Sequence, residues 1–220
     1  MGVFAGHGAV MQLVDFYTWP EGAIYLPWDV WAVTWLIAAL WANRTIKRPE
    51  FGREIGYRVV ALAGFALLLV FYGQSSDSFR AGHPAANPLL ARLWALPPDV
   101  GWAMVALCAF GFLFAWWARI HLGRLWSGRI TRKEGHRIVD SGPYGIVRHP
   151  IYTGIIIAGI ATAAEKATPL ALIGAALLYI GYWMKARLEE RFLSEELGPD
   201  AYAAYRARIP MLLPFGPKGF

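Results

Sequence analysis

Long apolar segments with almost no charged residues are the feature that most constrains the fold of this chain. Residues 100–118 contain no Asp, Glu, Lys or Arg, and the segment from about 24 to 42 contains only Asp29. Segments of this length approach the roughly 20 residues that an α-helix needs to cross a bilayer core of about 30 Å. Hydrophobic residues make up 57% of the chain and charged residues only 16%, which excludes an ordinary soluble domain. We therefore predict an all-α, polytopic integral membrane protein.

About five transmembrane helices are predicted, at 24–42, 56–72, 100–118, 151–164 and 169–184. The last two would reach only about 21 and 24 Å at 1.5 Å per residue, so each must include flanking residues or lie among other helices. Their short connection predicts a helical hairpin. The charged segment that follows is rich in helix formers, and we expect it to continue the last helix beyond the membrane and then form a second short helix.

Basic residues predict the orientation of these helices. Lys and Arg number five after the first helix, two after the second, seven after the third, one in the hairpin turn and six from Lys185 to the end. Segments rich in Lys and Arg stay in the cytoplasm. This alternation predicts an N-terminus outside and a C-terminus in the cytoplasm, and we expect a prokaryotic inner membrane. Because the basic residues collect between apolar segments, we expect membrane lipids and not nucleic acid as partners.

Cysteine and histidine usage argues against a disulfide or a metal centre. Cys108 is the only cysteine, which excludes an intramolecular disulfide. The histidines other than His149 have no partners at the spacing of metal ligands, so we expect no metal. Glycine-rich nucleotide loops and serine nucleophile motifs are absent from the sequence. The sequence leaves the oligomeric state open.

The loop before the fourth predicted helix, residues 142–152, concentrates glycine, proline, tyrosine, arginine and histidine. Proline is favoured at the first position of a helix, so Pro150 should begin the helix and His149 should lie at its cap. Free backbone N–H groups at a helix start attract anionic ligand groups. A purely structural interpretation, a turn with a capping histidine and interfacial Tyr144 and Tyr152, has about equal weight on this evidence alone.

A second charged cluster, residues 187–191, lies at the predicted cytoplasmic end of the fifth helix. Glu189 and Glu190 point about 100° apart on a helix, so only one can face a site while the other meets solvent or an arginine. A solvated charged face is the usual explanation of such a run. The alternative is a carboxylate that binds an ammonium group or ribose hydroxyls, neutralised by Arg148, Arg187 or Arg206.

Taken together, these motifs resemble the isoprenylcysteine carboxyl methyltransferase and phospholipid methyltransferase family of membrane enzymes. The resemblance covers about residues 119–215 and rests on the following residues: Gly142, Pro143, Tyr144, Val147, Arg148, His149, Pro150, Tyr152, Gly154, Glu189, Glu190, Leu193, Leu197, Gly198, Tyr202, Tyr205, Ile209 and Pro210. It implies an S-adenosylmethionine-dependent methyltransferase. We also predict one integrated membrane domain, in which an N-terminal tail and three helices (1–118) precede a cofactor-binding loop, a helical hairpin and a C-terminal catalytic segment (119–220).

The resemblance also implies roles for particular residues. The cofactor would be lined by Tyr144, Ile146, His149 and Tyr152, with Glu190 of the carboxylate pair at its polar end. The catalytic residues would be Arg206, Glu189 and Arg148: Arg206 would orient an acceptor anion, with Arg148 as the second choice, and Glu189 or Glu190 could accept a proton.

The acceptor would be a lipophilic small molecule or lipid, with a prenylcysteine-like carboxylate, a lipid amine or a thiol as the methylated group. Sterol reductases share a similar Arg-His-Pro-x-Tyr motif, so an NADPH-dependent membrane reductase is one alternative. A non-catalytic membrane binding protein is another.

Overall fold

The computed structural model describes residues 17–40, 45–47, 51–71, 73–126, 132–133, 138–197 and 199–218. Its helices are α2 (Pro20–Ala23), α3 (Leu26–Ala39), α4 (Phe51–Phe65), α5 (Ser76–Arg80), α6 (Pro98–Leu122), α7 (Pro150–Lys166), α8 (Pro169–Leu197) and α9 (Pro199–Arg208). A π-helical turn, η1 (Ala66–Val70), continues α4, and 3-10 turns lie at η2 (Pro88–Leu90), η3 (Gly123–Leu125) and η4 (Gly142–Gly145). In the described residues the only strands are the short antiparallel pair β1 (Thr45–Lys47) and β2 (Arg132–Lys133).

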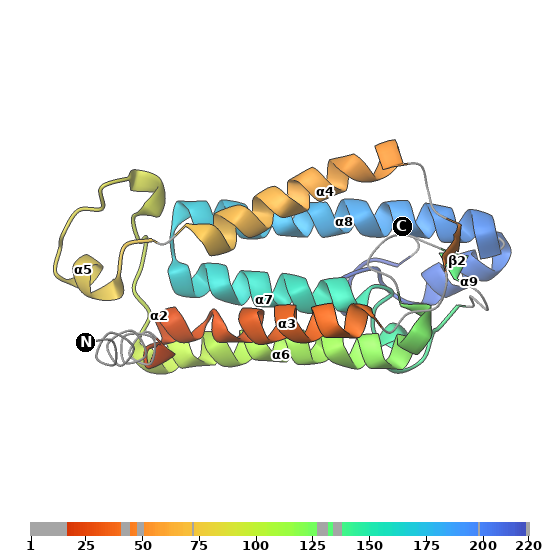
Figure 1. Cartoon of the computed structure of the whole chain (residues 1–220), viewed down its shortest axis with the longest axis horizontal. Coiled ribbons are helices and arrows are strands. Elements are labelled where there is room, and N and C mark those ends of the chain that lie inside the picture. Colours follow the sequence, from red (N-terminus) through yellow and green to blue (C-terminus); the bar gives the residue numbers. More distant parts are fainter. Residues whose placement is uncertain are drawn as a thin grey trace, which may run out of the picture.

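The five long helices lie along the long axis of the molecule, with α7 among them (Figure 1). Helix α7 packs against both α6 and α8, α4 packs against α8, and α3 packs against α6. One end of the bundle carries α5 and its flanking loops, and the other end carries α9 and the β1–β2 pair (Figure 1). The long helices thus connect two ends that carry different elements.

Each of the five predicted helices is present, with somewhat different bounds. Three helical segments, Pro20–Ala39, Pro98–Leu122 and Pro169–Glu195, are long and apolar enough to cross a membrane. Helix α7 is shorter, and most of its residues are buried, which confirms that so short a helix lies among others. That α4 and α7 also cross the membrane, and that the chain has five transmembrane helices, stays a prediction.

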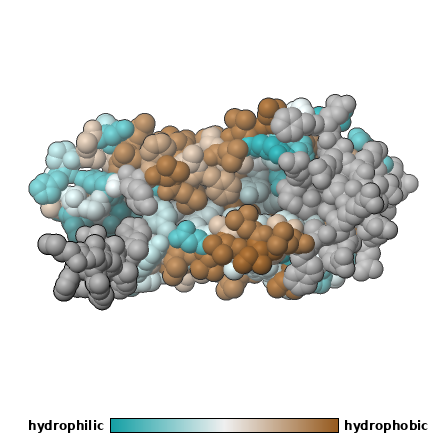
Figure 2. Space-filling view, viewed as in Figure 1, coloured by the Kyte–Doolittle hydropathy of each residue, from teal (hydrophilic) through white to brown (hydrophobic). Residues whose placement is uncertain are grey.

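The surface of the bundle is apolar along its middle. In Figure 2 hydrophobic residues gather over the central part of the molecule, and hydrophilic residues gather at the end that carries α5. On α3 and at its C-cap the exposed apolar side chains include Val33, Leu36, Ile37 and Leu40. An apolar belt of this kind is suited to contact with lipid chains.

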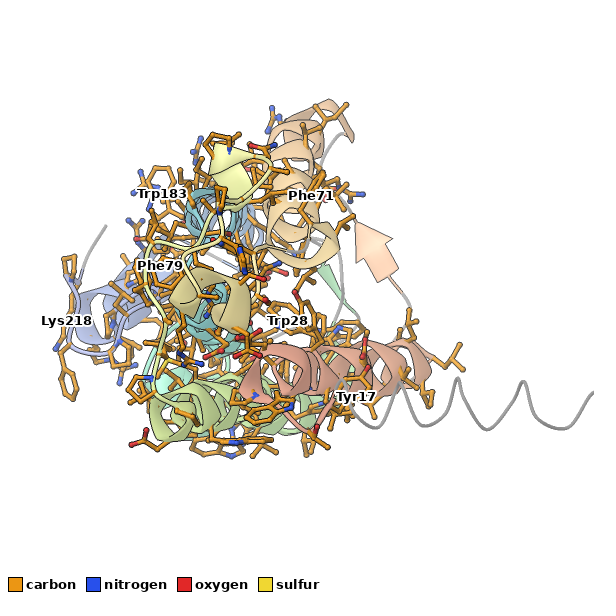
Figure 3. The ribbon with its side chains drawn as sticks, turned by 90° about the vertical axis from the view of Figure 1, so that its left-hand side faces the viewer. Tyr17, Trp28, Phe71, Phe79, Trp183 and Lys218 are labelled. Carbon is orange, nitrogen blue, oxygen red and sulfur yellow. The ribbon has the colours of Figure 1, made fainter. Side chains whose placement is uncertain are left out.

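Aromatic side chains fill the interior between α3, α4 and α6. Trp28 is buried, packs edge-on against Phe65 and Phe112, and donates a hydrogen bond from Nε1 to Thr162 Oγ1 at 2.9 Å. Seen along the bundle, Trp28 lies near the middle, whereas Phe71 and Trp183 lie towards the edge (Figure 3). The hydrogen bond satisfies the indole N–H, which would be costly to bury alone.

Two facing glycines set the spacing of α6 and α7. A Cβ added at Gly154 would lie 2.2 Å from the carbonyl oxygen of Gly111, and one added at Gly111 would lie 2.5 Å from the carbonyl oxygen of Gly154. Small residues at these positions therefore allow the two backbones to approach closely, as in other membrane helix pairs.

Replacing Gly154 by alanine should destabilise the bundle, because the new methyl group would meet backbone atoms that cannot move without separating α6 from α7. Overpacking of this kind costs about 1–3 kcal/mol. Gly52→Ala is the matched control, since a Cβ at Gly52 meets nothing within 4 Å and alanine is the better helix former by about 0.5–1 kcal/mol. Thermal unfolding of both purified variants in detergent measures the difference, and equal midpoints would contradict the close approach.

Candidate active site

The end of the bundle away from α5 brings together the loop at η4, the start of α7, the end of α8, and α9 with the segment after it (Figure 1). Backbone hydrogen bonds join the loop to the C-terminal segment: Arg148 N–H donates to Pro210 O at 2.9 Å, and His149 N–H donates to Met211 O at 3.1 Å. Thr153 Oγ1 donates to Leu212 O at 2.6 Å. The apolar segment after α9, which Pro210 and Pro214 interrupt, therefore packs against the protein.

The predicted start of the fourth long helix is confirmed. Helix α7 begins at Pro150, and His149 occupies its N-cap position without a capping hydrogen bond from its side chain. The imidazole is thus available for other contacts. The residues that it contacts lie on α7 and α8.

Arg148 and Glu190 form a buried ion pair at the centre of this region. Arg148 donates from Nε to Glu190 Oε1 at 2.7 Å and from Nη2 to Glu190 Oε2 at 3.2 Å. Its Nη1 donates to the carbonyl oxygens of Arg206 and Ile209. The side chain of Arg148 is fully buried, and that of Glu190 is 4% exposed. Arg148 therefore ties together α8, α9 and the C-terminal segment.

A ring stack leads from this ion pair towards the second carboxylate. His149 Nε2 lies 3.1 Å from Glu190 Oε1, and its ring stacks on Tyr152 with centroids 5.2 Å apart. The Tyr152 hydroxyl donates to Glu189 Oε2 at 2.6 Å. The Glu189 side chain is 26% exposed, so the two neighbouring carboxylates have different surroundings. Glu190 meets an arginine, as one of the pair was predicted to do, and Glu189 stays accessible.

Helix α9 adds two tyrosines and an arginine. The Tyr205 hydroxyl donates to the carbonyl oxygen of Tyr144 at 2.9 Å, and burial raises the pKa of this phenol above its ordinary value, so it remains a proton donor. Burial also raises the pKa of Tyr202, and the nearby Glu190 raises it further. Arg206 is one-third exposed, with Nε 3.6 Å from Glu190 Oε2.

All eight predicted site residues lie at this end, but with different exposure. Tyr144 is buried and stacks on His121 with centroids 6.3 Å apart, whereas Ile146 is 41% exposed. The guanidinium of Arg187 lies over the ring of Trp183. Partial exposure is shared by three side chains, those of Ile146, Glu189 and Arg206, which could contact a ligand directly.

Three further residues at this site were not predicted from the sequence. Lys185 places Nζ 4.8 Å from the centroid of the Tyr152 ring and 5.8 Å from that of Tyr57, and Tyr182 packs on Tyr152 at 5.1 Å. The positions of Lys185 and Tyr182, one and two helical turns before Glu189, were an available signal. Tyr57 lies on α4, in the part of the chain that carries no motif, so nothing in the sequence indicated it.

No group of three His, Cys, Asp or Glu side chains that could hold a metal ion occurs among the residues that the structure describes. His7 and His136 lie outside these residues.

Comparison with known proteins gives relatives for the half of the chain that forms this site. Residues 104–195 match the isoprenylcysteine carboxyl methyltransferase family. Protein-S-isoprenylcysteine O-methyltransferase B of Arabidopsis thaliana is 32% identical over 88 residues, 40% of this chain and 44% of the relative. Methanethiol S-methyltransferase of a Pseudomonas species is 32% identical over 129 residues, 57% of this chain and 45% of the relative.

The cobalt-zinc-cadmium resistance protein CzcN of Cupriavidus metallidurans is 32% identical over 121 residues, 53% of each chain. In these comparisons the chain spans about half the length of each relative. The family match begins within α6 and ends near the end of α8, so it includes both carboxylates but not Arg206.

Proposed function

The chain is related to the isoprenylcysteine carboxyl methyltransferase family through residues 104–195, and on this premise we propose that it is an S-adenosylmethionine-dependent methyltransferase acting on a lipophilic acceptor at the membrane. The observation that carries the proposal is the accessible Glu189 carboxylate beside the stacked His149 and Tyr152 rings, at the end of an apolar bundle. Relatives named as methyltransferases favour methyl transfer over the reductase alternative.

The residues at this end fit the functional groups of S-adenosylmethionine. Its ammonium group or ribose hydroxyls would donate to Glu189, which accepts one hydrogen bond from Tyr152 and keeps exposed surface. Its carboxylate, or an anionic acceptor, would pair with the partly exposed Arg206. The exposed Ile146 would pack against the adenine, which is apolar on its faces.

Buried Arg148 and Glu190 take a positioning role in this proposal. Four acceptor atoms surround the Arg148 guanidinium, and both oxygens of Glu190 are within hydrogen-bonding distance of Arg148 or His149. These groups hold the loop, α8 and α9 in register. Preorganised surroundings of this kind keep the groups that touch a ligand in place.

When bound, the cofactor would supply a methyl group already activated by a cationic sulfur. The protein would then have to align the acceptor with the sulfur–methyl bond and exclude water. Positioning and desolvation of this kind can supply most of the rate enhancement. An acceptor carboxylate needs no base. A thiol or amine acceptor loses a proton, and the partly exposed Glu189 would receive it.

A labelled-methyl transfer assay tests the proposed function. Purified protein in detergent would be incubated with methyl-labelled S-adenosylmethionine and, in separate reactions, extracted membrane lipids, prenylcysteine analogues and small thiols. We expect label in at least one organic-extractable product. Binding of NADPH without S-adenosylmethionine binding would instead favour the reductase alternative, and binding of neither would favour a non-catalytic protein.

The proposed reaction requires the site to face the cytoplasm, where the cofactor is available. The excess of Lys and Arg in the segments that lead to this end supports that orientation. In the proposed topology the N-terminus lies outside and the chain crosses the membrane five times. The C-terminal segment lies in the site itself, so a C-terminal reporter identifies the side on which the site lies.

A C-terminal fusion to green fluorescent protein should fluoresce, whereas a fusion to alkaline phosphatase should be inactive, because the phosphatase matures only outside the cytoplasm. The two fusions should be compared at matched expression in cells. An active phosphatase with a dark fluorescent protein would place the site outside and exclude a cytoplasmic cofactor.

A further inference from the structure

A cavity of about 390 Å³ lies at the end of the bundle opposite the candidate active site. It is bounded by α2, the loops around α5, the start of α6 and the end of α7. Figure 3 looks onto this end, where α5, which carries Phe79, and its flanking loops lie in front of the helix ends. Ligand sites in proteins commonly have volumes of about 300–1,000 Å³, so the cavity can hold more than a few water molecules.

The loop that covers the cavity is fixed to the hairpin between α7 and α8. Leu93 N–H donates to Ala167 O at 2.7 Å, and Trp94 Nε1 donates to Ala164 O at 3.1 Å. Arg92 is buried and donates from Nη2 to the carbonyl oxygen of Glu165. The cavity is therefore a built feature of the fold, with walls tied together by hydrogen bonds.

Charged side chains line the cavity in equal numbers. The carboxylates are Glu21, Asp77 and Glu165, and the cations are Arg80, Arg92 and Lys166. Lys166 donates from Nζ to the carbonyl oxygens of Leu68 and Phe71, at 2.6 Å each, and Arg92 lies 3.4 Å from Glu21 Oε1. Because the charges balance, the cavity favours a ligand with no net charge.

Glu165 carries a hydrogen-bond acceptor that no described residue satisfies. Its side chain is 4% exposed, and its Oε2 atom is buried and accepts no hydrogen bond from the residues that the structure describes. Its Oε1 atom lies 3.9 Å from Arg92 Nη2, too far for a hydrogen bond. A buried carboxylate oxygen without a donor is costly, and a ligand that brings an N–H group to this carboxylate would offset that cost.

We propose that this cavity binds a zwitterion with a primary ammonium group, which donates to the Glu165 carboxylate while its phosphate lies near Arg80 at the mouth. Arg80 lies 3.7 Å from Asp77 Oδ1 and donates to Leu96 O at 2.8 Å. Its side chain is half-exposed, so its guanidinium can also meet an anion at the entrance. The same chemistry is found in the headgroup of an aminophospholipid and in free phosphoethanolamine. A headgroup with a quaternary ammonium has no N–H to donate, so the site should discriminate against it.

Lipid binding to the full chain tests the proposal without reference to methyl transfer. Protein in detergent would be titrated with short-chain phosphatidylethanolamine, phosphatidylcholine and phosphatidylglycerol, and with free phosphoethanolamine, by isothermal calorimetry. We expect phosphatidylethanolamine to bind at least tenfold more tightly than the other two lipids. Binding of free phosphoethanolamine would identify the headgroup as sufficient, and lipid-only binding would identify a membrane lipid as the ligand; both support the site.

Variants on the two sides of the cavity locate the binding. Glu165→Gln should weaken phosphatidylethanolamine binding at least tenfold, because the amide would remove the charge that the ammonium meets. Arg80→Gln, at the exposed mouth, should weaken it severalfold and provides a test should Glu165→Gln not fold. Asp99→Asn is the matched control, since Asp99 is exposed at the same end and does not line the cavity. Equal affinity for phosphatidylethanolamine and phosphatidylcholine, or unchanged affinity in both cavity variants, would overturn the proposal.

Discussion

Replacing Glu190 by alanine should lower the thermal stability of the protein in detergent sharply and abolish methyl transfer. The change removes the partner of a fully buried guanidinium, because Arg148 directs Nε and Nη2 to the two oxygens of Glu190. Breaking a buried ion pair by removing one partner costs about 3–5 kcal/mol. That is a large share of the roughly 5–15 kcal/mol by which proteins of this size are stable.

The same substitution would also release His149, whose ring lies against Glu190. We therefore expect the loop at η4, α9 and the C-terminal segment to loosen together, which limited proteolysis would detect as early cleavage after residue 197. Glu195→Ala on the exposed side of α8 is the control and should change neither stability nor cleavage. Wild-type stability in the Glu190 variant would show that Arg148 does not depend on this carboxylate.

Much of the fold follows from apolar periodicity, length and proline positions. The segment 100–118 became α6, with a proline at its start, and Pro150 began α7 as its fixed backbone angle predicts. The hairpin was also predictable, but not the burial of Glu165 and Lys166 at its turn. Their burial depends on the loop before α6, which packs over the end of α7 through contacts distant in sequence.

The candidate site was predictable where one segment carries the signal. The loop at η4, the carboxylate pair and the tyrosines of α9 came together as the resemblance implied. The division of roles between the two carboxylates was not predictable, because the 100° between them does not say which one faces Arg148. Tyr57 was beyond prediction, since its position against Lys185 follows from the packing of α4 on α8.

Replacing Glu189 by glutamine should weaken S-adenosylmethionine binding while leaving the fold intact. The side chain is partly exposed and accepts one hydrogen bond from Tyr152, and a glutamine oxygen can still accept it. What is lost is the charge that would meet the ammonium group of the cofactor. Hydrogen bonds to charged groups contribute about 1.5–3 kcal/mol, so the dissociation constant should rise by roughly 10- to 150-fold.

Calorimetry with S-adenosylmethionine and thermal unfolding, run on the same preparations, separate this effect from that of Glu190. The Glu189 variant should unfold within a few degrees of the wild type, because the glutamine oxygen keeps the hydrogen bond from Tyr152. Glu195→Gln controls for charge, being an exposed carboxylate on the same helix. If the Glu189 variant binds the cofactor as the wild type does, Glu189 does not contact the ammonium group.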